Sequence, residues 1–258
     1  MATVRRVLAP NPGPFTGPGT NTWIIDAGPV VVVLDPGPDD DRHLAALRQA
    51  VAGRPVGVVL VTHSHADHLG LAERFAALVQ ARLARHPELA DGDVVRAGSL
   101  SLVALHTPGH ASDHLAYWMP DDRALFTGDL ILGRGSSMVA YPDGDVAAYL
   151  RSLERVAELV PRMLFPGHWD PITEGAPARI EEYRRHRLER ERQLLEVLAA
   201  GPGSVQELTE RVYGSELANV EGRSQLLRAA EMTLRAHLHK LLDEGRVEEC
   251  EGRFELTG

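Results

Sequence analysis

Four side chains that bind transition metals stand within one short segment, His63-Ser64-His65-Ala66-Asp67-His68. His63 and His65 are two residues apart, so on an extended backbone they lie on the same side and can hold one ion. Asp67 and His68 lie past a turn and can reach a second ion. Imidazole nitrogen and carboxylate oxygen suit Zn²⁺, with Mn²⁺ or Fe²⁺ as substitutes. The segment therefore predicts a metal site with room for two ions.

A polar loop with surface histidines is the alternative interpretation of this segment. It would suit a single histidine. The segment, however, directly follows a continuous apolar run at residues 56–62, which is typical of a strand buried on both faces. Four like-charged or desolvated groups packed together at the end of a buried strand cost free energy unless a bound cation compensates. We therefore favour the metal site.

Three further segments carry the same kind of signal, because each ends an apolar strand with a glycine followed by His or Asp. They are Gly109-His110, Gly128-Asp129 and Gly167-His168. Glycine allows the tight turn that aims the next side chain into a site. The single cysteine, Cys250, is distant in the sequence, so His and Asp must supply the ligands.

The elements that would position these residues can be read from the hydrophobic pattern. We predict strands at residues 22–26, 30–35, 56–62, 101–106, 115–119, 124–127 and 163–166, and helices at 39–52, 69–84 and 145–160. Strands alternating with helices, with polar residues at the strand ends, indicate an α+β fold in which helices cover the sheets.

The composition shifts near Gly175-Ala176-Pro177, and the pattern after it is mostly helical. We predict a long helix at 178–199, then helices at 204–212, near Glu216 and at 223–244. Ser204 and Glu207 form a capping-box pattern at the start of the second of these helices. Short strands at 247–250 and 253–256 would complete a small winged-helix module. The sequence thus predicts two domains, residues 1–176 and 177–258.

Composition narrows the class of protein. The net charge is −9, whereas proteins that hold duplex nucleic acid through its phosphates are usually basic, so we expect no duplex DNA partner. No apolar run reaches the ~18 residues that a membrane helix needs, and we identify no signal peptide. The lone Cys250 fits a reducing compartment. We therefore expect a cytoplasmic protein without a membrane partner.

The order of these motifs resembles the metallo-β-lactamase superfamily. The resemblance implies an αββα sandwich with a small C-terminal winged-helix domain and two Zn²⁺ at one edge of the sheets. It also implies the ligands: His63, His65 and His110 for the first metal, Asp67, His68 and His168 for the second, with Asp129 as the bridge. The best-known β-lactamases have a cysteine at the position of Asp129, which argues against antibiotic hydrolysis.

Other segments resemble the β-lactamase-like protein 2 group of that superfamily. They are residues 11–14 (NPGP), 19–23 (GTNTW), 130–133 (LILG), 186–187 (HR) and 190–193 (RERQ), together with the winged-helix terminus. Members of the group include an endoribonuclease that cuts single-stranded RNA and thioesterases acting on polyketide-type acyl chains. The stretch from Arg85 to Asp91 is shorter here than in animal members. The substrates of those members are therefore a weaker guide to the substrate of this protein.

The sequence leaves three functions open for this metal-dependent hydrolase. The first is endonucleolytic cleavage of single-stranded RNA by a hydroxide that two zinc ions activate. An arginine cluster would attract the phosphates, although interleaved glutamates equally indicate a solvated helix face. The second function is hydrolysis of a thioester or ester of a small acyl compound. The third, a winged-helix DNA-binding regulator, is disfavoured by the acidic charge, and a dimer contact suits that module better. The arginines of the cluster are Arg184, Arg185, Arg187, Arg190 and Arg192.

Three residues are assigned roles beside the metals. We expect Asp67 to orient the attacking water and to accept its proton, as the catalytic carboxylate. His114 is a candidate for contact with a substrate oxyanion, and the alternative is that it shapes its loop. Asn21 is a candidate for lining the substrate site, and the alternative is that it caps a turn.

Overall fold

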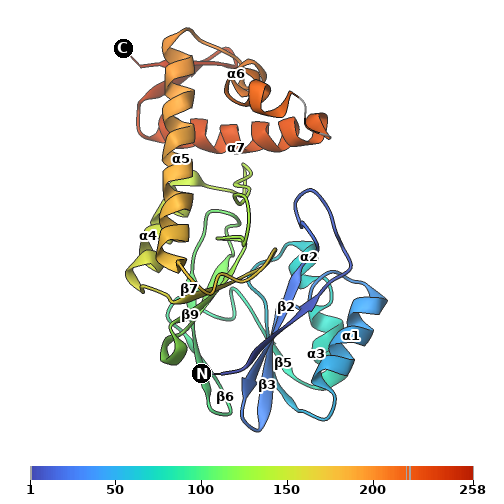
Figure 1. The fold of residues 1–258 in the computed structure, drawn as a ribbon. Helices are drawn as coiled ribbons and strands as arrows, with labels where there is room; N and C mark the ends of the chain where they lie inside the picture. Colours follow the sequence, from blue (N-terminus) through green and yellow to red (C-terminus); the bar gives the residue numbers. More distant parts are fainter. Residues whose placement is uncertain (1, 219, 221, 258) are drawn as a thin grey trace.

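Two five-stranded sheets packed face to face form the larger part of the molecule (Figure 1). The structure is a computed structural model that describes residues 2–218, 220 and 222–257. The first sheet has the order β1 (Val4–Leu8), β2 (Asn21–Ala27), β3 (Val30–Leu34), β4 (Val56–Leu60), β5 (Arg82–Ala84). The second has the order β10 (Met163–Pro166), β9 (Ala124–Gly128), β8 (Leu115–Met119), β7 (Leu100–His106), β6 (Val94–Ala97).

The apolar run of β3 shows why the central strands are buried on both faces. Val32 and Leu34 point into the core between the two sheets. Val31 and Val33 point the other way, into a second core beneath the helices. Successive side chains of a strand alternate between its faces, so a strand with two covered faces needs apolar residues throughout. The same alternation holds for β4, which the sequence predicted to be buried on both faces.

Helices cover the outer face of each sheet. Parallel pairing of β3 with β4 and of β4 with β5 requires crossover connections, which carry α1 (Asp41–Val51) and α3 (Ala72–Val79). The Asp40 side chain caps the first turn of α1. On the second sheet lie α4 (Val146–Glu158) and the first half of α5 (Ala176–Ala199). A short 3-10 helix, η1 (Pro120–Asp122), links β8 to β9. The predicted αββα sandwich is confirmed.

One predicted helix is wrong in extent. Residues 69–84 do not form a single helix, because α2 (Ala66–Leu69) and α3 are separate and β5 follows them. The backbone of Gln80 is left-handed, at φ 54°, and this ends α3. The edge strands β1 and β6 were not predicted either. The short helix expected near Glu216 is the last turn of α6 (Val205–Leu217).

The C-terminal part packs around the far half of α5, which rises out of the sandwich in Figure 1. Leu194 and Leu198 of α5 share a core with α6, α7 (Arg223–Asp243) and the hairpin β11 (Val247–Cys250)–β12 (Arg253–Leu256). The winged-helix fold is confirmed, and so is the capping box of Ser204 and Glu207.

The domain division at residues 176 and 177 stays a prediction, and the ends of its two ranges, residues 1 and 258, lie outside the described residues. Among the described residues, no helix combines the length and the apolar character that crossing a membrane requires.

Candidate metal centre

The polar segments singled out in the sequence meet at one edge of the sandwich. The 63–68 segment follows β4, His110 follows β7, Asp129 follows β9 and His168 follows β10. Strands from both sheets therefore deliver their terminal loops to one place. The two ion-binding groups predicted from the sequence lie side by side there.

Glycines make these loops fit, for two different reasons. Gly109 and Gly128 have φ angles of 135° and 46°, which side-chain-bearing residues rarely adopt. Gly167 instead supplies room, because a Cβ atom there would lie 2.5 Å from Asp129 Oδ1. Gly109 and Gly128 thus permit the turns before His110 and Asp129, and Gly167 permits the close approach of Asp129.

The first group brings three imidazoles together. His63, His65 and His110 each present one ring nitrogen within 4.8 Å of the others. His63 Nε2 lies 2.9 Å from His65 Nδ1, and His110 Nε2 lies 3.1 Å from the same atom. Nitrogen lone pairs that converge in this way are the arrangement that a tetrahedral metal ion requires.

The second group contains Asp67, His68 and His168. His168 Nε2 lies 3.2 Å from Asp67 Oδ2 and 3.4 Å from His68 Nε2. Asp129 reaches both groups, since its Oδ1 lies 3.4 Å from His68 Nε2 and its Oδ2 lies 3.6 Å from His110 Nε2. Its carboxylate is therefore placed between the two sets of nitrogens.

Outer partners fix the orientation of most of these rings. His68 Nδ1 bonds to Asp35 Oδ2 at 2.9 Å, and His110 Nδ1 bonds to the Met138 carbonyl at 2.7 Å. His168 Nδ1 bonds to the Gly19 carbonyl at 3.2 Å. An acceptor on the outer nitrogen holds the tautomer in which the inner nitrogen is free to bind a metal.

Burial and mutual charge set the protonation of the cluster. Burial favours neutral Asp129, but His168 and His68 outweigh it, so the pKa of Asp129 is well below its usual range. Burial would lower the pKa of His168, yet Asp129 raises it to about 9. The pKa of His68 is raised by Asp129 and Asp35 against the effect of burial. Without a metal these imidazoles hold protons, so metal binding must release them.

The donor set fits divalent cations. Imidazole and carboxylate groups that are almost fully buried, with facing donor atoms, would repel one another or stay unsatisfied without a cation. Asp129 Oδ1 is one such atom, because it is buried and makes no hydrogen bond within the described residues. Nitrogen and oxygen donors at these separations suit first-row transition metals.

The two candidate substrate residues lie behind the cluster. His114 is fully buried, its Nδ1 bonds to Thr107 Oγ1, and its Nε2 accepts the Asp129 backbone N–H at 3.2 Å. Asn21 donates to the carbonyls of Pro166 and Trp169 at 2.9 and 2.7 Å. Both side chains therefore hold loops that carry metal-facing residues, and their roles as substrate residues stay predictions.

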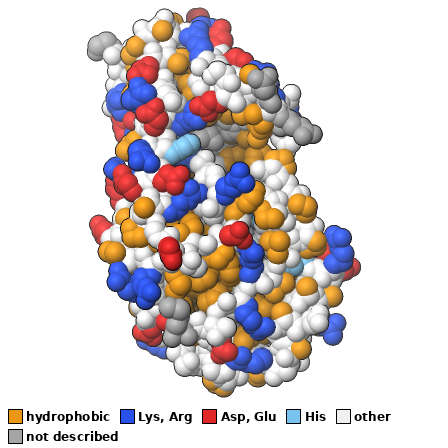
Figure 2. All heavy atoms as spheres, viewed as in Figure 1, with side chains coloured by type: hydrophobic (Ala, Val, Ile, Leu, Met, Phe, Trp, Pro, Cys, Tyr) orange, Lys and Arg blue, Asp and Glu red, His pale blue; other side chains and the backbone are white. Residues whose placement is uncertain are grey.

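A cleft of about 950 Å³ opens directly above the cluster, between the sandwich and the winged helix. Asp67, His110, Asp129 and His168 stand at its floor. In Figure 2, hydrophobic side chains gather where the C-terminal part, at the top of the view, meets the sandwich. Apolar residues line both walls of the cleft, and they include Phe15, Leu132, Met138, Leu217, Leu226 and Ala230.

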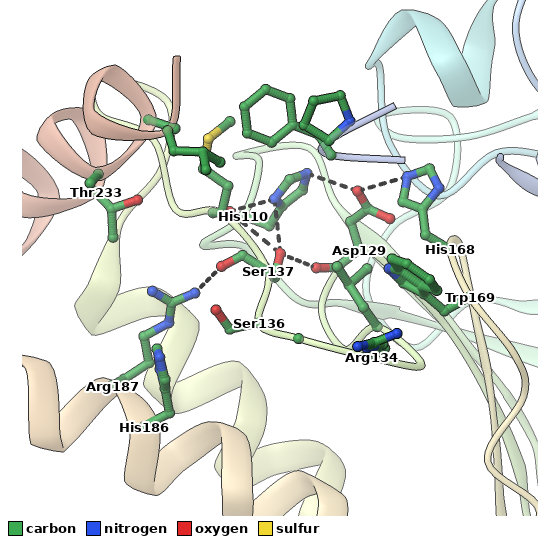
Figure 3. Close-up of a pocket in the computed structure, with 18 of the residues that line it drawn as sticks. His110, Asp129, Arg134, Ser136, Ser137, His168, Trp169, His186, Arg187 and Thr233 are labelled. Carbon is green, nitrogen blue, oxygen red and sulfur yellow. Dashed lines mark hydrogen bonds and ion pairs between the residues drawn. The ribbon is translucent and has the colours of Figure 1, made fainter. Parts of the chain in front are cut away.

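The arginine cluster of α5 divides into two kinds. Arg184 and Arg192 pair with glutamates on the helix surface, as in a solvated face. Arg187 and Arg190 turn toward the cleft instead. Arg190 pairs with Glu216 at 2.9 Å, whereas Arg187 is buried and donates to the Ser137 carbonyl, as Figure 3 shows. The inward direction of these two side chains was not predicted.

Comparison with known families gives the class of this fold and site. The description "Metallo-beta-lactamase superfamily" matches residues 15–91 and 87–168, and "Beta-lactamase associated winged helix domain" matches residues 204–253. The chain belongs to the metallo-beta-lactamase superfamily, and it is a metallohydrolase of that fold. Members of the superfamily bind divalent metals, and the His and Asp cluster for them is present here.

Individual relatives indicate which group within the superfamily the chain resembles. It is 35% identical to an atrochrysone carboxyl ACP thioesterase of Aspergillus chevalieri, over 99% of this chain and 84% of the relative. It is 30% identical to a beta-lactamase-like protein 2 homolog of Drosophila melanogaster, over 95% and 90%. A metallo-beta-lactamase family protein from Thermus thermophilus superposes with a TM-score of 0.83 at 25% identity, over 98% of each chain. The resemblance to the β-lactamase-like protein 2 group is confirmed.

Proposed function

We propose that this protein hydrolyses thioesters of acyl compounds at a centre of two divalent cations, with zinc as the native metal. His63, His65 and His110 would hold one ion, Asp67, His68 and His168 the other, and Asp129 would bridge them. The observation that carries the proposal is the apolar cleft directly above the cluster, because an acyl chain requires such a wall and an RNA backbone does not. The thioesterase named among the relatives supports the same choice.

The proposed hydrolysis would use both the bound metals and the side chain of Asp67. Two bound divalent cations would lower the pKa of a shared water and polarise the thioester carbonyl. Asp67 is the carboxylate that borders the cleft, and its Oδ2 lies 3.2 Å from His168 Nε2. Burial favours its neutral form, but His168 and His68 outweigh that effect and lower the pKa of Asp67. The ionised carboxylate can therefore orient an attacking water and accept its proton.

The rest of the cleft would bind the acyl group and exclude water. Phe15 and Met138 flank the cluster on the sandwich side, and Leu226 and Ala230 face them from α7. An alkyl chain between these walls would leave water at about 0.8 kcal/mol for each buried methylene. The same walls offer little to a phosphodiester backbone.

The RNA hypothesis stays a prediction, and two observations weigh against it. The net charge is −9, and Arg184 and Arg192 of α5 are paired with glutamates. Phosphate binding by these arginines would have to break those pairs.

One experiment separates the two substrate classes. Zinc-loaded protein is incubated with octanoyl-S-N-acetylcysteamine, with the matching oxygen ester and with labelled single-stranded RNA. We expect thiol release, and we expect Asp67→Asn to slow it by about 10²- to 10⁴-fold. Bound zinc is measured for each variant. Asp91→Asn, which alters a carboxylate paired with Arg155 at the surface, is the matched control and should leave the rate unchanged. RNA cleavage that Asp67→Asn abolishes, without thioester turnover, would overturn the proposal.

A further inference from the structure

Arg187 is a buried cation for which the fold supplies no anion. It comes from the middle of α5, it is only 3% exposed, and it borders the cleft (Figure 3). Its guanidinium donates to the Ser137 carbonyl and lies over the Tyr149 ring, 5.2 Å from the centroid. Within residues 2–218, 220 and 222–257, no carboxylate forms an ion pair with it.

The cations around Arg187 are different, because each forms an ion pair with a carboxylate. Arg190 pairs with Glu216 at 2.9 Å, and Lys240 pairs with Glu191 at 2.6 Å. Within the described residues neither glutamate forms an ion pair with Arg187. Arg187 therefore differs from these neighbouring cations in having no paired carboxylate.

Two histidines beside Arg187 have ring nitrogens that also lack hydrogen-bond partners among the described residues. Among the described residues, neither ring nitrogen of His237, which is 1% exposed, finds a hydrogen-bond partner, and nor does Nδ1 of His186. Burial together with the nearby Arg187 charge lowers the pKa of His237 to about 3 and that of His186 to about 4. Both rings are thus neutral, and His186, which lines the cleft, has a nitrogen free to complete the binding of a group held by Arg187.

The chemistry of the guanidinium indicates which kind of group would pair with Arg187. A buried charge without a partner costs several kcal/mol. The planar guanidinium fork matches the two oxygens of a carboxylate or a phosphate. The position is also close to the chemistry, since the Ser137 hydroxyl bonds to the Asp129 carbonyl at 2.5 Å. An oxyanion held here would belong to the same ligand that reaches the metal cluster.

We propose that Arg187 forms an oxyanion subsite, which binds a carboxylate or phosphate of the substrate at a distance from the thioester bond. This inference rests on the proposed thioesterase function and specifies its substrate class as anionic acyl thioesters. The anion belongs either to the far end of the acyl chain or to the thiol part. The alternative is that Arg187 only holds the loop of Ser137, and in that case its loss would affect all substrates equally.

The test compares three thioesters in zinc-loaded protein: a neutral acyl thioester, the same compound with a terminal carboxylate on the acyl chain, and the neutral acyl group on 4′-phosphopantetheine. We expect Arg187→Met to raise the KM of one anionic substrate by about 10- to 100-fold, since a charged hydrogen-bonding pair is lost. The kcat and the KM of the neutral substrate should not change. The anionic substrate that responds identifies the side that carries the anion.

Two further variants complete this comparison. Arg187→Lys, which keeps the charge but loses the fork, should lie between Arg187→Met and the native protein. Arg211→Met, on the surface of α6, is the matched control and should behave as the native protein. Equal changes in KM for all three substrates, or a change in kcat alone, would overturn the subsite.

A second variant keeps the test valid if Arg187→Met does not fold. Thr233 lines the cleft, and it lies one helical turn from His237 on the same face of α7 (Figure 3). Thr233→Glu would supply the missing carboxylate from within the chain. We expect a higher Tm and loss of the preference for anionic substrates. A preference that survives in Thr233→Glu would contradict the proposal.

Failure of the proposed function can be told apart from failure of the subsite. If native protein turns over no thioester, calorimetry follows the binding of thioether analogues with and without the anionic group. Weaker binding of the anionic analogue to Arg187→Met than to native protein would support the subsite. Equal binding to both proteins would overturn it.

Discussion

Replacement of Asp35 by asparagine should weaken the binding of one of the two proposed metal ions more than that of the other. Asp35 is fully buried, and its Oδ2 accepts from His68 Nδ1 and from the Thr62 hydroxyl, both at 2.9 Å. Its Oδ1 accepts the Thr62 backbone N–H at 2.7 Å. Among the proposed ligands, only His68 bonds to this carboxylate directly within the described residues. His63 Nδ1 is connected to it through the Thr62 hydroxyl, at 3.0 Å, so the effect should be largest for the ion of His68 and smaller for that of His63.

The magnitude follows from the bonds that are lost. Asparagine tolerates the left-handed backbone of Asp35, at φ 52°, and its carbonyl can still accept from Thr62 N–H. Its amide nitrogen is a donor, so it cannot accept from His68 or from the Thr62 hydroxyl. Hydrogen bonds to a charged group contribute about 1.5–3 kcal/mol. Loss of such an outer partner typically costs about 10- to 100-fold in metal affinity, which is the same range.

The assay is a zinc titration of the metal-free protein in competition with a chelating dye, which resolves two binding steps. We expect one step to weaken by about 10- to 100-fold and the other to weaken less. Asp26→Asn is the matched control, because that carboxylate pairs with Arg54 on the surface at 2.8 Å. If both steps stay at native affinity, or if both weaken equally, then the assignment of Asp35 to one ion is refuted.

Two further predictions concern stability. Gly109→Ala should destabilise the fold by about 2–4 kcal/mol, since its φ of 135° is strained for alanine and its Cβ would overlap the backbone of Tyr149. In urea unfolding, Gly53→Ala (φ 77°, with open space around the Cβ) is the control and should lose only about 1 kcal/mol. His237 has a pKa of about 3 when folded and about 6.5 when unfolded, so below pH 6.5 the unfolded chain takes up a proton that the folded chain does not. Its contribution to stability is therefore lost as pH falls from 6.5 toward 3, by about 2 kcal/mol at pH 5. His237→Leu should remove that part of the decline between pH 7.5 and 5, and an unchanged slope would contradict this account.

The metal centre was largely predictable because its signals are local. Each segment with candidate ligands follows a strand, and a glycine stands before His110, Asp129 and His168. Residue type and spacing are enough to recognise such positions. Asp35, by contrast, lies in a different loop from His68, so its bond to that ring could not be predicted from either segment alone.

The edge strands were less predictable. β5 has three residues, and it follows a helix that ends at Gln80 without a glycine to mark the left-handed turn. Apolar periodicity over so short a stretch does not distinguish a strand from another helical turn. Pairing with β4 decides the matter, and that contact is formed by distant segments.

The burial of Arg187 could not be predicted from the neighbouring sequence. It stands in a run of arginines and glutamates that is typical of an exposed helix face. The structure buries Arg187 because the loop of Ser137 and the helix α7 both cover that face of α5. Only the tertiary arrangement separates it from its exposed neighbours Arg185 and Arg192.

The continuity of α5 constrains how this protein can change. The helix has 24 residues and therefore extends about 36 Å. Its first half is fixed in the core of the sandwich and its second half in the core of the winged helix. One residue inserted at its midpoint would rotate the winged helix by about 100° and carry one wall of the cleft away from the metal cluster. Loops on either side of the cleft can lengthen without this rotation, whereas the length of α5 can change only by near-whole turns.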